Sequence, residues 1–81
     1  MTNIQAATKA TRSTVRRVLG ARTGITVKTA IGYDVARRIT TTVTTVSYPL
    51  GTAYGELAEA LAPGTMAVVA GEYAMTIVRA I

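Results

Sequence analysis

The apolar and polar positions of the first twenty residues alternate at helical spacing. Steps of three and four residues separate the positions on one side, which are Ile4, Ala7, Thr11, Val15, Val18 and Leu19. At about 100° per residue these positions share an arc of about 120°. Gly20 follows them, and glycine commonly ends a helix. The pattern predicts an amphipathic helix over residues 3–19.

The middle of the chain carries two competing patterns. An apolar stripe steps mainly by four residues through Val27, Ile31, Val35, Ile39, Val43 and Val46. Hydrophobic periodicity is the primary indicator of secondary structure, and this stripe favours a helix over residues 28–47. Residues 39–46, however, are all β-branched, and such residues prefer extended backbone. The alternative is a β-hairpin over residues 25–46 that turns at residues 32–34.

Turn residues divide the rest of the chain. Pro49 and Gly51 predict a turn, and Thr52 can then cap a short helix over residues 52–62. A second break at Pro63 and Gly64 precedes a predicted helix over residues 66–79. The four stretches together predict an all-α fold, a small bundle of three to four helices. The alternative is an α+β fold that contains the hairpin.

Two groups of residues are candidates for helix packing and assembly. In a helical reading, Val35, Ile39, Val43 and Val46 share an arc of about 80°. In the last predicted helix, small residues would let another helix approach closely. These small residues are Ala67, Gly71 and Ala74.

Length and composition point to a single small domain, residues 1–81, that needs a partner. Chains of 81 residues have small cores and are often stabilised by disulfides, metals or association. Cysteine and histidine are both absent, which leaves association. Only 16% of the residues are charged, against about 25% in an average domain, so part of the apolar surface is expected to be covered.

The charges divide the chain into a basic half, residues 1–38, and a nearly neutral apolar half, residues 39–81. The first half holds eight Lys or Arg and one acid, Asp34, while the second holds Arg79 and three Glu. Such an imbalance indicates an anionic partner for the first half. The expected contact residues lie on and just after the first helix. They are Lys9, Arg12, Arg16, Arg17 and Arg22.

Enzymatic activity is not expected. Catalytic proton transfer uses His or a carboxylate with a shifted pKa, and nucleophiles need an activating base. The chain has no His, no Cys and only four carboxylates, of which Glu56 and Glu59 fit the first turn of a helix. We therefore expect no catalytic residues, no cofactor and no metal site.

These observations predict a non-enzymatic structural or assembly subunit of a larger complex or virion-like particle. Its partners would be other protein subunits, and its basic helix would contact an anionic molecule. One alternative is a sequence-independent nucleic-acid-binding protein that contacts phosphates. Another is a peripheral membrane protein whose first helix lies on an anionic bilayer. No secretory signal is recognisable, so we expect an intracellular protein or a component of a particle.

Overall fold

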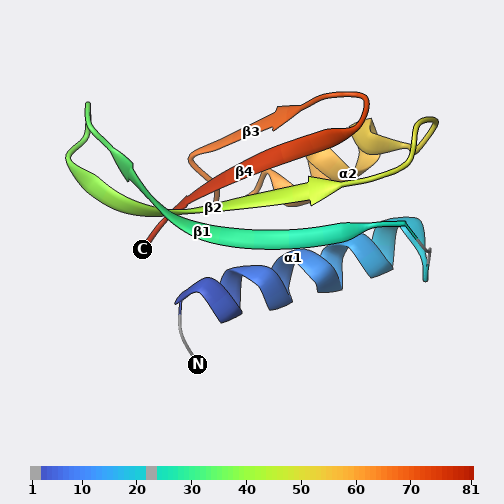
Figure 1. The fold of residues 1–81 in the computed structure, drawn as a ribbon, viewed down its shortest axis with the longest axis horizontal. Coiled ribbons are helices and arrows are strands. Elements are labelled where there is room, and N and C mark those ends of the chain that lie inside the picture. Colours follow the sequence, from blue (N-terminus) through green and yellow to red (C-terminus); the bar gives the residue numbers. More distant parts are fainter. Residues whose placement is uncertain (1–2, 22–23) are drawn as a thin grey trace.

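The computed structural model describes residues 3–21 and 24–81 of the chain. Within these residues the fold is α+β, with two helices and a four-stranded antiparallel sheet. Figure 1 shows the elements in chain order. They are α1 (Asn3–Leu19), β1 (Thr26–Asp34), β2 (Ile39–Ser47), α2 (Tyr54–Leu61), β3 (Ala67–Ala70) and β4 (Ala74–Ala80).

The prediction of an all-α bundle is wrong, although two of its helices exist. The first helix is confirmed. It ends at Leu19, and the next residue, Gly20, closes the last turn with a φ of 77° and an N–H···O=C bond to Arg16. The helix predicted over 52–62 is α2. The stretch 28–47 instead forms the antiparallel pair β1–β2, as in the α+β alternative, and the stretch 66–79 forms β3 and most of β4.

The sheet has the strand order β1–β2–β4–β3, so β1 and β3 are its edges. In the β1–β2 hairpin Val27 pairs with Val46 and Asp34 pairs with Ile39. The turn therefore lies at residues 35–38, later than the predicted 32–34. The Asp34 carboxylate accepts the backbone N–H of Arg37 there at 3.0 Å. Figure 1 shows that this end of the hairpin projects beyond the helices and the other strands.

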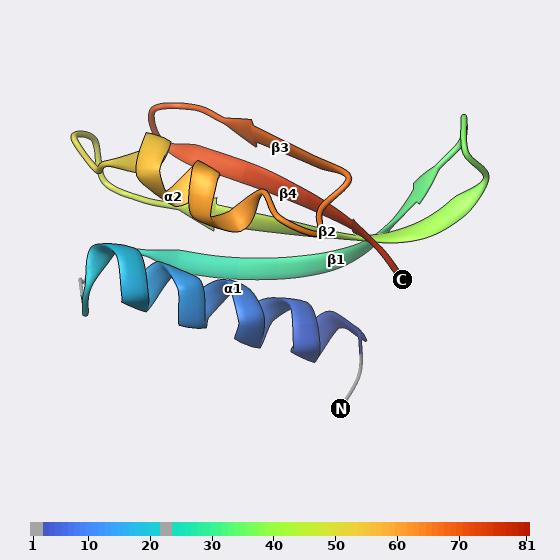
Figure 2. The ribbon, with the colours of Figure 1, turned by 180° about the vertical axis from the view of Figure 1, so that it is seen from behind.

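Both helices cover the same face of the sheet, as the view from behind in Figure 2 shows. Helix α1 packs on β1 and β2, and α2 packs on β3 and β4. Since side chains alternate along a strand, each strand sends every second residue into this layer. Neither described helix lies over the opposite face of the sheet. The buried core contains Val15, Leu19, Val27, Val46, Tyr48, Leu57, Leu61, Met75 and Ile77.

Three threonine hydroxyls between α1 and the sheet are hydrogen-bonded in series. Thr8 donates to Thr29 at 2.7 Å, and Thr29 lies 3.0 Å from Thr44 on the next strand. Thr44 is fully buried, and an unpaired hydroxyl there would lose its hydration without compensation. This chain of hydrogen bonds fixes the N-terminal half of α1 over β1 and β2.

The predicted helix-packing residues take different places in the strands. The supposed common stripe of Val35, Ile39, Val43 and Val46 does not exist, because Val46 enters the core, Val43 lies on the opposite face, and Val35 is in the turn and 79% exposed. The three small residues do not lie on a helix either. Ala67 is in β3, Gly71 in the following turn and Ala74 in β4. An assembly role for these residues stays a prediction.

Gly32 in β1 is required by the close approach of β2. A Cβ atom at this position would lie 2.7 Å from Val43 Cγ2 and 2.9 Å from Thr41 Oγ1. Thr41 is buried, and both neighbours are β-branched and therefore stiff. We expect Gly32→Ala to lower the free energy of unfolding by about 1–3 kcal/mol, the usual cost of overpacking.

Urea denaturation would measure this loss, with Gly55→Ala as the matched control. Gly55 lies in α2 and nothing would touch its Cβ within 4 Å, so alanine should stabilise the helix. Equal stability of the Gly32 variant and the unchanged protein would contradict the packing at this position.

Candidate nucleic-acid interface

Helix α1 carries its cations outside the side that is buried against the sheet. Ala7, Thr11, Val15 and Leu19 form the buried side of the helix. At 100° per residue, the positions of the cations fall outside this buried stripe. All four are exposed, and they are Lys9, Arg12, Arg16 and Arg17. From Lys9 to Arg17 the axis of the helix advances by about 12 Å.

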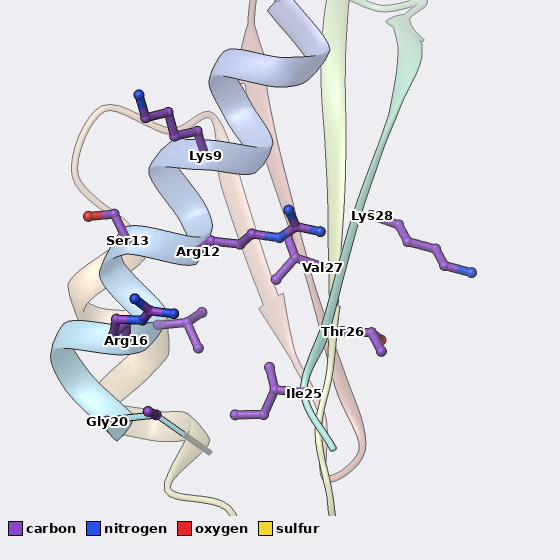
Figure 3. Close-up of a pocket in the computed structure, with 11 residues that line it drawn as sticks. Lys9, Arg12, Ser13, Arg16, Gly20, Ile25, Thr26, Val27 and Lys28 are labelled. Atoms are coloured by element: carbon purple, nitrogen blue, oxygen red, sulfur yellow. The ribbon is translucent and has the colours of Figure 1, made fainter. Parts of the chain in front are cut away.

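A groove of about 810 Å³ runs between α1 and the first residues of β1. Figure 3 shows that the Arg12 side chain extends from the helix across this groove toward Val27, while Lys9 points away from β1. Lys28 leaves β1 on the side away from the helix. The residues at the groove include Lys9, Arg12, Ser13, Arg16, Ile25, Thr26 and Lys28.

The structure brings Lys9, Arg12 and Arg16 to one groove and adds Lys28, which the sequence analysis did not include among the contact residues. Arg17 lies on the same helix but does not line the groove. Arg22 lies outside the described residues. The β-hairpin alternative could have indicated Lys28, because that strand follows α1 and returns alongside it.

No carboxylate neutralises these cations within residues 3–21 and 24–81. The one ion pair of this part of the chain joins Arg37 Nη1 to Asp34 Oδ2 at 3.5 Å, in the hairpin turn. The other acids lie elsewhere, Glu56 and Glu59 on α2 and Glu72 between β3 and β4. The α1 side of the molecule is therefore a surface of uncompensated positive charge.

Two further titratable groups belong to the packing of the fold. Arg79 Nη1 donates to Thr11 Oγ1 at 3.2 Å beneath α1, and burial lowers the pKa of this guanidinium. Tyr48 donates its hydroxyl to the Gly71 carbonyl and stacks on Tyr54 with ring centroids 5.9 Å apart. Burial and then the neighbouring Tyr54 raise the pKa of Tyr48.

Comparison with known protein families, curated proteins and solved structures finds no match. A proposal of function therefore depends on the site alone. Across the described ranges, no three side chains of Asp, Glu, His or Cys gather as metal ligands. Neither described helix combines the length and the apolar character that crossing a membrane requires.

The arrangement can bind an extended anion along its length. Four exposed cations on α1 present charge over more than one turn of helix. A duplex nucleic acid carries one phosphate charge per about 1.7 Å of its axis, so about 12 Å of α1 faces about seven charges. A single small anion would meet only part of this surface.

Proposed function

We propose that the protein is a non-enzymatic nucleic-acid-binding protein whose helix α1 lies along the phosphate backbone. The observation that carries this proposal is the row of cations on α1 without ion pairs among the described residues. Phosphate contacts release condensed counterions, which makes binding strong at low salt and independent of base sequence.

The composition of the site supports binding without base recognition. Adenine is read by the side-chain amides of Asn or Gln, and single strands are bound by stacking on aromatic rings. Asn3 and Gln5 are the only side-chain amides of the chain. None of the four tyrosines is among the residues that line the groove.

An assembly subunit, with other protein subunits as its partners, is the second candidate, and a separate observation favours it. The projecting hairpin exposes large apolar side chains, with Ile31 53%, Tyr33 60% and Val35 79% accessible. Exposed apolar groups that lie together often mark contacts with other proteins. The two functions are compatible, because a subunit packed against a genome would contact both protein and phosphate.

The membrane alternative receives less support. An amphipathic helix that lies on a bilayer inserts its apolar side into the lipid. In α1 that side, with Val15 and Leu19, packs against the sheet and α2 and is buried. Only the charged side remains for a bilayer.

Isolation of the native, untagged protein at about 0.1 M and about 1 M salt would test the proposal. We expect nucleic acid of mixed sequence to co-purify at low salt and to be lost at high salt, because phosphate contacts weaken steeply with salt. A protein complex that survives high salt would favour the assembly subunit instead. Co-purified anionic lipid without nucleic acid would contradict the proposal.

A further inference from the structure

The outer edge of β1 is not paired with another strand among the described residues. This strand has nine residues and one neighbour, β2, so half of its backbone N–H and C=O groups point away from the sheet. Natural edge strands are usually shortened, bulged, interrupted by proline or guarded by charged side chains, and of these devices β1 has only the charges of Lys28 and Asp34. Strand β1 contains no proline and pairs with β2 at every residue from Thr26 to Asp34. The opposite edge, β3, has only four residues.

The sequence of β1 is complementary to itself in one antiparallel register. With a two-fold axis at Ile31, Lys28 lies opposite Asp34 of a second copy, and Asp34 lies opposite the second Lys28. Directly opposite residues of antiparallel strands have side chains on the same face, so each pair places unlike charges together. A shift of the axis by one residue, to Ala30 or Gly32, removes both pairs.

In the monomer both charges lie on the face away from the helices, although Asp34 also contacts Arg37 in its own turn and its side chain is 25% exposed. Val27 is in the core and Thr29 bonds to Thr8 of α1, so Lys28 and Asp34, at even positions, face away from the helices. Figure 3 shows Lys28 pointing to that side. Asp34 Oδ1 accepts the Arg37 N–H, whereas its Oδ2 has only the Arg37 guanidinium at a long 3.5 Å. This oxygen can accept from a lysine.

The same register covers the exposed apolar residues of the hairpin. Ile31, 53% exposed, meets its own copy at the axis. Tyr33, 60% exposed, lies opposite Thr29 of the second copy, next to the N-terminal half of that copy's α1. Just after the strand, Val35 of one copy lies opposite Val27 of the other copy, which lines the groove between α1 and β1. Ala30 of each copy lies opposite Gly32 of the other, and these small residues leave room for the two strands to approach closely.

We propose that two copies of the chain associate through β1 in this register and form one continuous eight-stranded sheet. Such an interface is isologous, with each copy using the same residues. Both helix layers then lie on one side, and Lys9 of each copy still points away from β1. The inference does not depend on nucleic-acid binding, because it uses the edge of β1 and the hairpin.

Sedimentation velocity at about 100 μM protein, without nucleic acid, tests the proposal. We expect a mass twice the 8.5 kDa of one chain. Lys28→Glu places like charges opposite each other and should give the monomer mass, as should Asp34→Lys. The double variant, which exchanges the two charges, should restore the dimer. Lys9→Glu is the matched control, and its mass should stay that of the unchanged protein.

A mass of 8.5 kDa for the unchanged protein would overturn the proposal, as would a dimer of the Lys28→Glu variant. Because the charge exchange also alters the hairpin turn, Ile31→Lys gives a second test. It sets two cations against each other at the axis and should give monomers. A dimer that fails to bind DNA would contradict only the proposed function, and a monomer that binds DNA would contradict only this inference.

Discussion

Simultaneous replacement of Arg12, Arg16 and Arg17 by alanine is expected to lower the affinity for duplex DNA several-hundred-fold at about 0.1 M salt. Each phosphate contact contributes about 0.9 to the slope of log affinity against log salt, so three contacts account for a factor of about 500 between 1 M and 0.1 M. Fluorescence anisotropy with a labelled duplex of arbitrary sequence would measure the loss.

The matched control replaces the same three arginines by lysine. It keeps the charge of the exposed side of α1, so phosphate binding should remain within a few-fold of the unchanged protein. All three side chains are exposed, and neither set of substitutions removes a core contact. If the alanine variant bound as tightly as the lysine variant, α1 would not be the binding surface.

Leu57→Ala is expected to have the largest effect on stability. Leu57 is fully buried in the core that α2 shares with α1 and the sheet. Truncation of a buried leucine typically costs about 2–5 kcal/mol, because the cavity closes only in part. An 81-residue domain has about 4–12 kcal/mol of stability in total, so the variant should be partly unfolded at 37 °C.

Urea denaturation followed by circular dichroism measures this effect, and Leu50→Ala serves as the control. Leu50 lies in the turn after β2 and is 66% exposed, so its truncation should change the midpoint little. Equal midpoints for the two variants would show that α2 does not close the core as described.

The favoured prediction contained α1, whereas β1 and β2 appeared only in the hairpin alternative. The spacing of the apolar residues explains this difference. A step of four residues returns to nearly the same side of a helix, and it also returns to the same face of a strand. The stripe through Val27, Ile31 and Val43 therefore could not distinguish the two structures. In α1 the steps of three, as from Ile4 to Ala7, would divide the apolar residues between the two faces of a strand, because an odd step changes the face, whereas in a helix they stay on one side.

The β-branched run of residues 39–46 was the better indicator of local structure. Among its threonines, Thr44 is buried and bonded to Thr29 on the neighbouring strand. Such pairing across a sheet depends on long-range register, which residue spacing along one segment does not reveal. The stretch 66–79, which was predicted as a helix, forms β3 and most of β4, which pair with each other on either side of Gly71.

Most of the candidate site could be predicted because it lies on one helix. The cations of α1 follow from helical geometry once the apolar side is known. Lys28 comes near them only through the fold, because β1 lies alongside α1, and its side chain points away from the helix. The complementary charges of Lys28 and Asp34 likewise suggest pairing between two copies only once β1 is known to be an edge strand.

The salt dependence of DNA binding tests the central claim most directly. We predict that log affinity of the unchanged protein falls linearly with log salt, with the same slope for duplexes of unrelated sequence. The triple alanine variant of Arg12, Arg16 and Arg17 should show a slope smaller by about three. An affinity that does not change between about 0.05 M and 0.3 M salt, or equal slopes for the two proteins, would contradict binding through the α1 cations.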